Sequence, residues 1–247
     1  MNGDEKKANL KQIVIYLLVT FILTYGMEIF VIMPMVGSTD VNTAYMAQSL
    51  ISSVMFFPAT GALVTILITR DRLLGNLRLS LNLKGNLKYY GLVWPGFVLL
   101  IFLGTALYFV IFPDNFDSEM GYVQVLLKAQ AESAGIPAES VGAEQAKSLM
   151  VSQIAMGIVM SPLLNLLTCL GEEWGWRGYL LPRLQKQFKV VPALLIGGLI
   201  WGLWHAPLTV MGHNYGVGYP GYPVTGIVAM CVFCTVMGII LSYVTIK

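Results

Sequence analysis

Residues 13–36 read IVIYLLVTFILTYGMEIFVIMPMV and contain one charged residue, Glu28. The hydrocarbon core of a bilayer is about 30 Å thick, and a helix of roughly 20 apolar residues crosses it. This stretch is therefore long enough to span a membrane. It is longer than the apolar region of a signal peptide and lacks an obvious small-residue cleavage site, so we predict an uncleaved first span.

The same pattern recurs along the chain. Four further segments are comparably long and apolar: residues 47–69, 89–112, 191–211 and 224–246. A sixth span is expected within residues 149–181, but this stretch is too long for one span, so the register of its helix stays open. Ser161-Pro162 in its middle is expected to start or kink a helix, because proline has no amide proton. The sequence predicts an all-α, polytopic membrane helix bundle with about six transmembrane helices.

The composition also indicates that most of the chain is surrounded by lipid. Of the 247 residues, 56% are hydrophobic and 11% are charged, and the mean hydropathy is +0.71. A soluble domain carries roughly a quarter charged residues. The net charge is only +2 and no basic block occurs, so we expect the lipid bilayer, and no nucleic acid, as a partner. Cys169, Cys231 and Cys234 lie in apolar runs, which predicts packing residues and no disulfides.

The distribution of Lys and Arg predicts the orientation, because cytoplasmic loops carry an excess of them. With the N-terminus in the cytoplasm, most of these residues lie inside: Lys6, Lys7, Lys11, Arg70, Arg72, Arg78, Lys84, Lys88, Arg183, Lys186, Lys189 and Lys247. The polar, acidic segment 113–147 holds only Lys128 and Lys147 and is expected outside. We therefore predict a multi-pass protein of the plasma membrane, with residues 1–247 forming a single transmembrane domain.

Ionisable residues inside a span are costly and mark function or pairing by default. Three of them fall in one window, GEEWGWRGYL at 171–180. On a helix, Glu173 and Arg177 are four residues apart and can pair, whereas Glu172 is rotated by about 100° from Glu173. A desolvated carboxylate without a full partner is suited to act as a general base near neutral pH. The alternative is that all three residues form one buried salt-bridge knot that holds helices together.

His205 lies on the next span, in IWGLWHAP at 200–207. If Pro182 and Pro192 mark the inner boundary, the rise of a helix places Glu172 at ~15 Å and His205 at ~20 Å depth. The two side chains are then within about one helical turn of the same depth. The alternative for a lone intramembrane histidine is a hydrogen bond between helices.

Two other ionisable residues are expected to be structural. Glu28 has no partner in the sequence and is expected to be a structural residue or to lie near the outer interface. His213 lies in a loop rich in Gly and Pro, so we expect a loop residue rather than a second histidine of the site.

The chain resembles the CPBP family of intramembrane proteases, the CAAX protease and bacteriocin-processing group, at these residues. Glu172-Glu173-x-x-x-Arg177 is similar to the first motif of the family. Trp201-x-x-x-His205 is similar to the second motif, which usually has Phe in the first place. The resemblance covers about residues 161–247, and the first three spans match only in hydropathy.

The resemblance implies an intramembrane endopeptidase that hydrolyses a membrane-associated peptide or protein. Glu172 would activate water, Glu173 and Arg177 would hold it and tune its charge, and His205 would stabilise the oxyanion or bind a metal. A divalent metal such as zinc would have His205 and Glu172 as ligands. Catalytic zinc usually has three protein ligands, and the sequence has no His-Glu-x-x-His, so the cofactor stays open, as does the oligomeric state.

One departure from the family keeps two alternatives open. Family members carry a later His-x-x-x-Asn or His-x-x-x-Asp on a further helix, which these 247 residues do not contain, and we expect the intact protein to continue past Lys247. The first alternative is a catalytically inactive bacteriocin-immunity or binding protein on the same scaffold. The second is a transporter in which Glu172, Glu173 and Arg177 relay protons, although no inverted repeat supports it.

Overall fold

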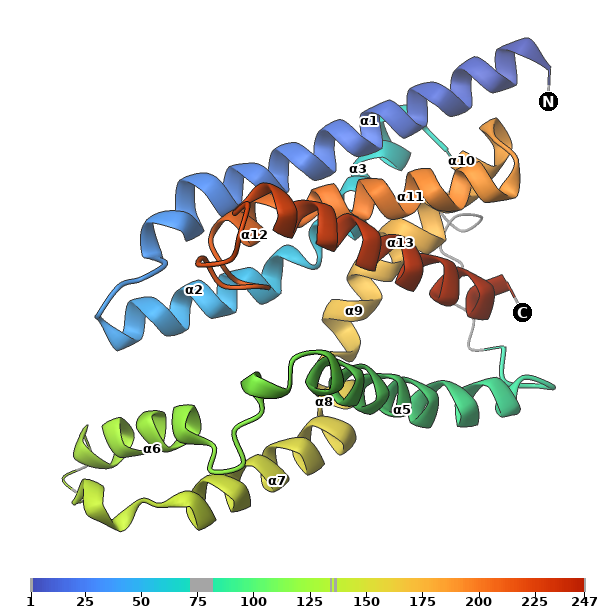
Figure 1. Cartoon of the computed structure of the whole chain (residues 1–247). Coiled ribbons are helices and arrows are strands. Elements are labelled where there is room, and N and C mark those ends of the chain that lie inside the picture. Colours follow the sequence, from blue (N-terminus) through green and yellow to red (C-terminus); the bar gives the residue numbers. More distant parts are fainter. Residues whose placement is uncertain (1, 72–81, 134, 136, 247) are drawn as a thin grey trace. The chain divides into compact units, whose positions relative to one another are not determined.

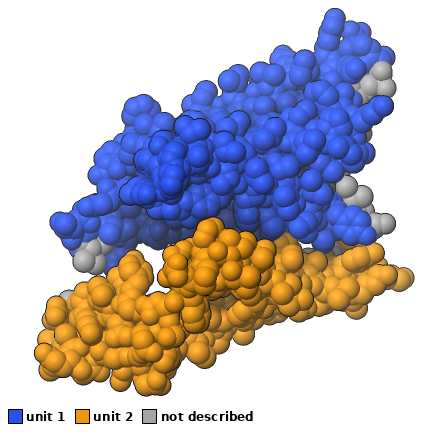
Figure 2. Space-filling model, viewed as in Figure 1, with its two compact units in different colours: residues 1–81, 167–247 blue, residues 82–166 orange. Residues whose placement is uncertain are grey.

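A computed structural model describes residues 2–71, 82–133, 135 and 137–246. Within these ranges every regular element is a helix and none is a strand, which confirms the predicted all-α fold. The chain divides into two compact units, residues 1–81 with 167–247 and residues 82–166 (Figure 2). Arg72, Arg78 and Lys247, three of the residues behind the predicted orientation, lie outside the described residues.

The first unit contains the N-terminal and C-terminal parts of the chain (Figure 1). Its elements, in chain order, are α1 (Gly3–Met27), the π-helix η1 (Glu28–Ile32), the 3₁₀ turn η2 (Met33–Met35), α2 (Val41–Val54), α3 (Phe57–Thr69), α9 (Leu166–Glu173), the π-helix η5 (Trp174–Leu180), α10 (Leu181–Gln187), α11 (Val190–Trp204), α12 (Ala206–Val210) and α13 (Val224–Ile246).

The second unit contains one long apolar helix and a polar helical hairpin. Its elements are α5 (Leu87–Ile111), the 3₁₀ turns η3 (Pro113–Asn115) and η4 (Ala138–Ser140), α6 (Gly121–Ser133), α7 (Ala143–Val159) and α8 (Ser161–Leu164). None of the residues of α5 is buried, as expected for a helix surrounded by lipid. The Trp94 Nε1 donates a hydrogen bond of 2.9 Å to the Ile158 carbonyl, which fixes α5 against α7.

Three described helical segments are long and apolar enough to cross a membrane: Gly3–Met35, Leu87–Ile111 and Val224–Val244. A fourth span results if α2 and α3 are taken together, because they pass the same test but bend by 44° at their junction. The polytopic membrane bundle is thus confirmed, with three to four continuous spans where the sequence suggested about six.

The other two expected spans are interrupted. The segment predicted over residues 191–211 ends its main helix at Trp204, and the short α12 follows after His205. The stretch 149–181 is divided among α7, α8, α9 and η5. Ser161 begins α8 with Pro162 in its first turn, as the sequence predicted for a helix start.

Two glycines allow α11 and α13 to pack side by side (Figure 1). Gly198 and Gly202 are four residues apart on α11, so they lie on one face. A Cβ atom at Gly198 would lie 2.5 Å from the Thr235 Cα, and one at Gly202 would overlap Cys231. Small residues at such positions let backbones approach closely, which stabilises helix pairs in lipid through van der Waals contact.

Glycines also join α1, α3 and η5. A Cβ atom at Gly61 of α3 would overlap the Thr20 Oγ1 of α1, and one at Gly175 of η5 would overlap Pro58 of α3. Helix α3 therefore packs closely against both α1 and η5, the segment that carries Arg177.

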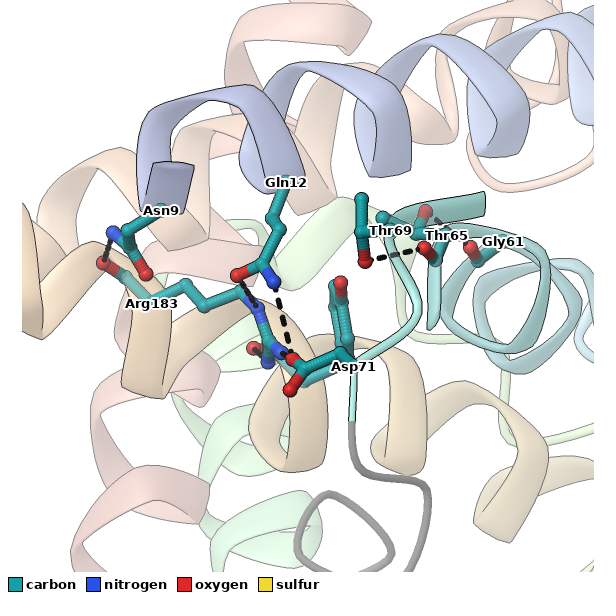
Figure 3. Close-up of polar contacts among 8 residues, drawn as sticks. Asn9, Gln12, Gly61, Thr65, Thr69, Asp71 and Arg183 are labelled. Atoms are coloured by element: carbon teal, nitrogen blue, oxygen red, sulfur yellow. Dashed lines mark hydrogen bonds and ion pairs between the residues drawn. The ribbon is translucent and has the colours of Figure 1, made fainter. Parts of the chain in front are cut away.

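A polar network around the buried Arg183 connects α1, the end of α3 and α10 (Figure 3). The Arg183 Nη2 lies 2.7 Å from the Asp71 Oδ2, and the Arg183 Nε donates to the Gln12 Oε1 at 3.2 Å. The Gln12 Nε2 donates to the same Asp71 oxygen at 3.1 Å, and the Asn9 Nδ2 donates to the Arg183 carbonyl at 2.9 Å. Arg183, which the sequence suggested as a loop cation, is thus a buried residue that ties α1, the end of α3 and α10 together.

Candidate functional site

The two sequence motifs meet through a hydrogen bond to Glu172. Glu172 lies in the last turn of α9 and is only 6% exposed. Its Oε1 accepts a hydrogen bond of 2.5 Å from the Trp201 Nε1 on α11. A carboxylate in the first motif is therefore oriented by the first residue of the second motif.

His205 lies where α11 ends and α12 begins. Its Nδ1 is 2.9 Å from the Trp201 carbonyl oxygen. Because a carbonyl can only accept a hydrogen bond, Nδ1 carries the proton, and in the neutral ring Nε2 carries the lone pair. The same tryptophan thus contacts Glu172 through its side chain and His205 through its backbone.

Trp204 holds this end of α11 against α1. Its ring packs edge-on against His205, with the ring centroids 4.7 Å apart. Its Nε1 donates a hydrogen bond of 2.7 Å to the buried Thr24 Oγ1. The Tyr25 hydroxyl adds a hydrogen bond of 2.6 Å to the Leu203 carbonyl.

Arg177 pairs with Glu173, as their spacing predicts. The Arg177 Nη1 is 2.9 Å from the Glu173 Oε1, and Arg177 is the more deeply buried partner. The guanidinium carbon also lies 3.9 Å from the centre of the Trp201 ring, a cation–π contact. Arg177 therefore braces the indole that donates to Glu172. Within the described part of the chain Glu172 itself forms no ion pair, so the salt-bridge knot of all three residues is not formed.

The local chain conformation around Arg177 is a π-helix, Trp174–Leu180. The π-helix forms i→i+5 hydrogen bonds and is frequent at functional sites. Gly175 is required here because its backbone lies against Pro58 of α3. The segment buries Trp176, Tyr179 and Leu180.

Sequence reasoning missed the role of Trp201 as a hydrogen-bond donor. The motif by itself indicates only that Trp201 is an aromatic replacement for phenylalanine. The signal was nevertheless present, since an indole has an N–H group that a phenyl ring lacks. A buried indole N–H usually finds an acceptor, and the nearest motif offers a carboxylate.

Two of the three cysteines pack inside the protein as predicted. Cys231 and Cys234 are buried free thiols, whereas Cys169 is a free thiol at an exposed position. The Cys234 Sγ lies 3.8 Å from the His205 Nδ1, so this thiol packs against the histidine from α13.

Glu28 and His213 lie apart from the two motifs. Glu28 is completely buried at the start of η1, not at an exposed interface. His213 is an exposed residue of the turns after α12, as predicted. It lines a cavity of about 220 Å³ together with residues of η2, α2 and α12 that include Met35, Ile51, Leu208 and Met211.

The donor set does not fit a complete metal site. Among the described residues, no group of three or more His, Cys, Asp or Glu side chains is placed to hold a metal ion. Glu172 and His205 supply two potential ligands, whereas catalytic zinc usually has three protein ligands.

Comparison with known proteins places the C-terminal part of the chain in a family context. Residues 153–247 match the family described as type II CAAX prenyl endopeptidase Rce1-like. The CAAX prenyl protease 2 of Methanococcus maripaludis is 40% identical over 52 residues. That alignment covers 21% of this chain and 19% of the relative, so the match spans about a fifth of the relative's length. No solved structure matches the chain.

Both matches confirm the resemblance to the CAAX protease and bacteriocin-processing family. The family match contains the whole of both motifs, from Glu172 to His205.

Proposed function

We propose, from the premise that residues 153–247 are CAAX-protease-like, that this chain is an intramembrane endopeptidase that cleaves a membrane-associated peptide or protein. The observation that supports it most directly is the hydrogen bond from the Trp201 Nε1 to the buried Glu172 Oε1. A carboxylate that is buried, oriented by a neutral donor and free of an ion pair keeps an oxygen available for a water molecule.

Glu172 serves in this proposal as the general base. Its Oε1 is occupied by Trp201, so the other oxygen takes a proton from water as the hydroxide adds to the peptide carbonyl carbon. The carbon–nitrogen bond then breaks, and the proton held by Glu172 passes to the leaving amine nitrogen. Each turnover consumes one water molecule.

Arg177 and Glu173 are positioning residues in the same proposal. The ion pair to Glu173 and the contact with the Trp201 ring fix the guanidinium, and the guanidinium in turn fixes the indole. Because the site is buried among helices, these polar interactions act in a low dielectric and are stronger than they would be in water.

His205 is proposed to stabilise the oxyanion. Its Nδ1 proton is committed to the Trp201 carbonyl. Donation to an oxyanion must therefore come from Nε2, and this nitrogen is a donor only when the ring carries a second proton.

The location of the protein in the cell is also part of the proposal and rests on its helices and its charges. The apolar helices and the family match indicate a membrane protein. We place it in the plasma membrane with the N-terminus in the cytoplasm, on the distribution of Lys and Arg.

The first test measures cleavage by the full chain in lipid nanodiscs. Two probes are used: a prenylated peptide ending in a CAAX sequence, the substrate named for the relatives, and an unprenylated apolar membrane peptide. We expect Glu172→Gln to lower kcat at least about a hundredfold, the magnitude typical of a general base. Glu144→Gln, at an exposed glutamate of the second unit, serves as the control and should cleave as the unchanged protein does. Equal cleavage by the unchanged chain and Glu172→Gln would overturn the proposal.

A second assay separates the enzyme from a binding protein on the same scaffold. The assay measures survival of cells exposed to a bacteriocin. If the chain protects them by binding alone, the Glu172→Gln and His205→Ala variants will still protect them. If it acts by cleavage, both substitutions will abolish the protection.

A further inference from the structure

A row of buried polar side chains runs along α1 and ends at the first residue of η1. Tyr16, Thr20, Thr24 and Glu28 are spaced four residues apart, and each is 0% exposed. Successive side chains at this spacing lie one turn apart and about 40° round the helix, so each is next to the one before it. Tyr16 and Glu28 are twelve positions apart, which corresponds to about 18 Å along a helix axis. We refer to these four residues as the α1 polar row.

Several polar atoms in this row have no partner on another helix. Within the described residues, both carboxylate oxygens of Glu28 form no hydrogen bond, and the Tyr16 hydroxyl and the Thr20 Oγ1 lie close to one another but have no hydrogen-bond partner on another helix. Only Thr24 has a hydrogen-bond partner on another helix, the Trp204 Nε1. Buried polar groups are normally paired with protein or with ordered water. Ordering a water molecule there costs less than leaving these groups dry.

One end of the row lies at the candidate site. The ring of Tyr16 packs against Trp176 and Tyr179 of η5, with centroid distances of 5.8 Å and 5.2 Å. The Tyr16 hydroxyl is close enough to Glu172 and Arg177 to interact electrostatically with both. The Trp176 Nε1 is buried in the same region, close enough to Glu172 to interact with its carboxylate.

The α1 polar row does not continue beyond Tyr16 toward the N-terminus of α1. Gln12, one turn before Tyr16, uses its amide on Asp71 and its oxygen on Arg183 (Figure 3). Ile13 is apolar and buried. Polar groups at this end are therefore satisfied by the protein itself.

The opposite end of the row lies near a cavity. Glu28 begins the π-helix η1, which packs against α2 and α12. The cavity of about 220 Å³ lies between η2, α2 and α12, the elements that adjoin or pack against η1. Its polar residues are Gln48 and His213.

We propose that the α1 polar row is a binding path for water, which enters at the cavity near Glu28 and supplies the hydrolytic water to Glu172. The inference deepens the proposed function and rests on it, because hydrolysis inside a bilayer consumes water that the lipid does not supply. Glu28 marks the entrance, Thr20 the middle, and Tyr16 the last position before the carboxylate. Tyr16 and Thr20 are thus positioning residues that act through bound water.

Kinetics provide the first half of the test. Thr20→Val keeps the shape of the side chain and removes its hydroxyl, and Tyr16→Phe keeps the ring contacts with Trp176 and Tyr179. We expect each substitution to lower kcat at least fivefold while KM stays unchanged. Thr65→Val is the matched control: Thr65 is equally buried on α3, but its hydroxyl bonds within its own helix, to the Gly61 carbonyl. Its kcat should stay within twofold of the unchanged protein.

The second half does not depend on activity. Radiolytic hydroxyl-radical labelling of the full chain in lipid nanodiscs modifies side chains that contact bound water. We expect Tyr16 to be labelled despite its burial, and its labelling to fall at least threefold in Thr20→Val while that of Tyr179 is unchanged.

These outcomes separate the inference from the proposed function. An unlabelled Tyr16 in the unchanged protein, or kcat within twofold for both Thr20→Val and Tyr16→Phe, overturns the water path. If the unchanged chain cleaves neither probe, the proposed function fails, and the labelling of Tyr16 alone decides whether the path exists.

Discussion

At the scale of single residues, Trp201 contacts three residues of the proposed site: Glu172, Arg177 and His205. Its indole donates to Glu172, its ring carries the Arg177 guanidinium, and its carbonyl accepts from His205. A phenylalanine at this position would keep the cation–π contact and the backbone hydrogen bond. It would lose only the donor to the carboxylate, so the substitution isolates that one interaction.

Trp201→Phe is therefore expected to lower kcat by about tenfold to a hundredfold. A hydrogen bond to a charged group contributes about 1.5–3 kcal/mol, and each 1.36 kcal/mol is a factor of ten in rate. KM should change little, because Trp201 is proposed to act on the base and not on the substrate. The measurement is steady-state cleavage by the full chain in nanodiscs.

Trp204→Phe is the matched control for that substitution. It also removes one buried indole N–H, but this group donates to Thr24 on α1 and not to Glu172. We expect it to lower the free energy of unfolding by about 1 kcal/mol and to reduce kcat less than Trp201→Phe does. A larger loss of kcat in Trp204→Phe would contradict the role given to Trp201.

At the scale of helices, the position of the second motif depends on the packing of α11 against α13. Gly198 and Gly202 leave no room for a side chain at this contact. Gly197, the neighbour of Gly198, differs: a Cβ atom there would make an ordinary contact, 3.6 Å from the Leu184 Cδ1. Two glycines of the same helix, Gly197 and Gly202, therefore predict opposite outcomes.

Gly202→Ala is expected to lower the free energy of unfolding by about 1–3 kcal/mol, the usual cost of overpacking. Gly197→Ala should be neutral or stabilising by up to ~1 kcal/mol, because alanine has the higher helix propensity. Thermal unfolding of the purified chain in detergent compares the two variants. Equal midpoints would show that the close approach of α11 and α13 does not contribute to stability.

Helix breaks, like helix contacts, were only partly predictable. Ser161-Pro162 starts a helix as expected, because proline tolerates the first turn. The break at His205 carries the same signal, because Pro207 lies in the first turn of α12, whereas the π-helix η5, with the sequence WGWRGYL, contains no proline. The packing of Gly175 on Pro58 and the hydrogen bonds of Trp201 and Trp204 accompany these irregular turns.

At the scale of the whole molecule, the network around Arg183 joins parts of the chain that are far apart in sequence. Gln12, Asp71 and Arg183 belong to α1, the end of α3 and α10 (Figure 3). Breaking a buried ion pair by removing one partner leaves an uncompensated charge and is strongly destabilising.

Asp71→Asn is expected to destabilise the first unit by about 2–4 kcal/mol, somewhat less than a fully buried pair because the Asp71 side chain is 28% exposed. Glu144→Gln, at an exposed pair with Lys147, should change stability by less than about 1 kcal/mol. Chemical denaturation of both variants in detergent micelles measures the difference. Similar values for the two would contradict the structural role of the Arg183 network.

The sequence by itself determined that lipid surrounds most of the chain, that the fold is helical and which two motifs the chain carries. Long apolar runs, few charges and the spacing of Glu172, Glu173 and Arg177 are local properties that require no knowledge of packing. The pair between Glu173 and Arg177 belongs to this group, because its partners are four residues apart.

Only the tertiary structure decided which faces of the helices meet. A helix that is apolar on all sides gives no periodic signal for its inner face, so the burial of Tyr16, Thr20 and Glu28 on one side of α1 could not be read from the pattern. Trp201 and Glu172 are 29 residues apart, and Asp71 and Arg183 are 112 apart. Such contacts depend on how closely the helix backbones approach, which is set by small residues and by pairing among the few buried polar groups.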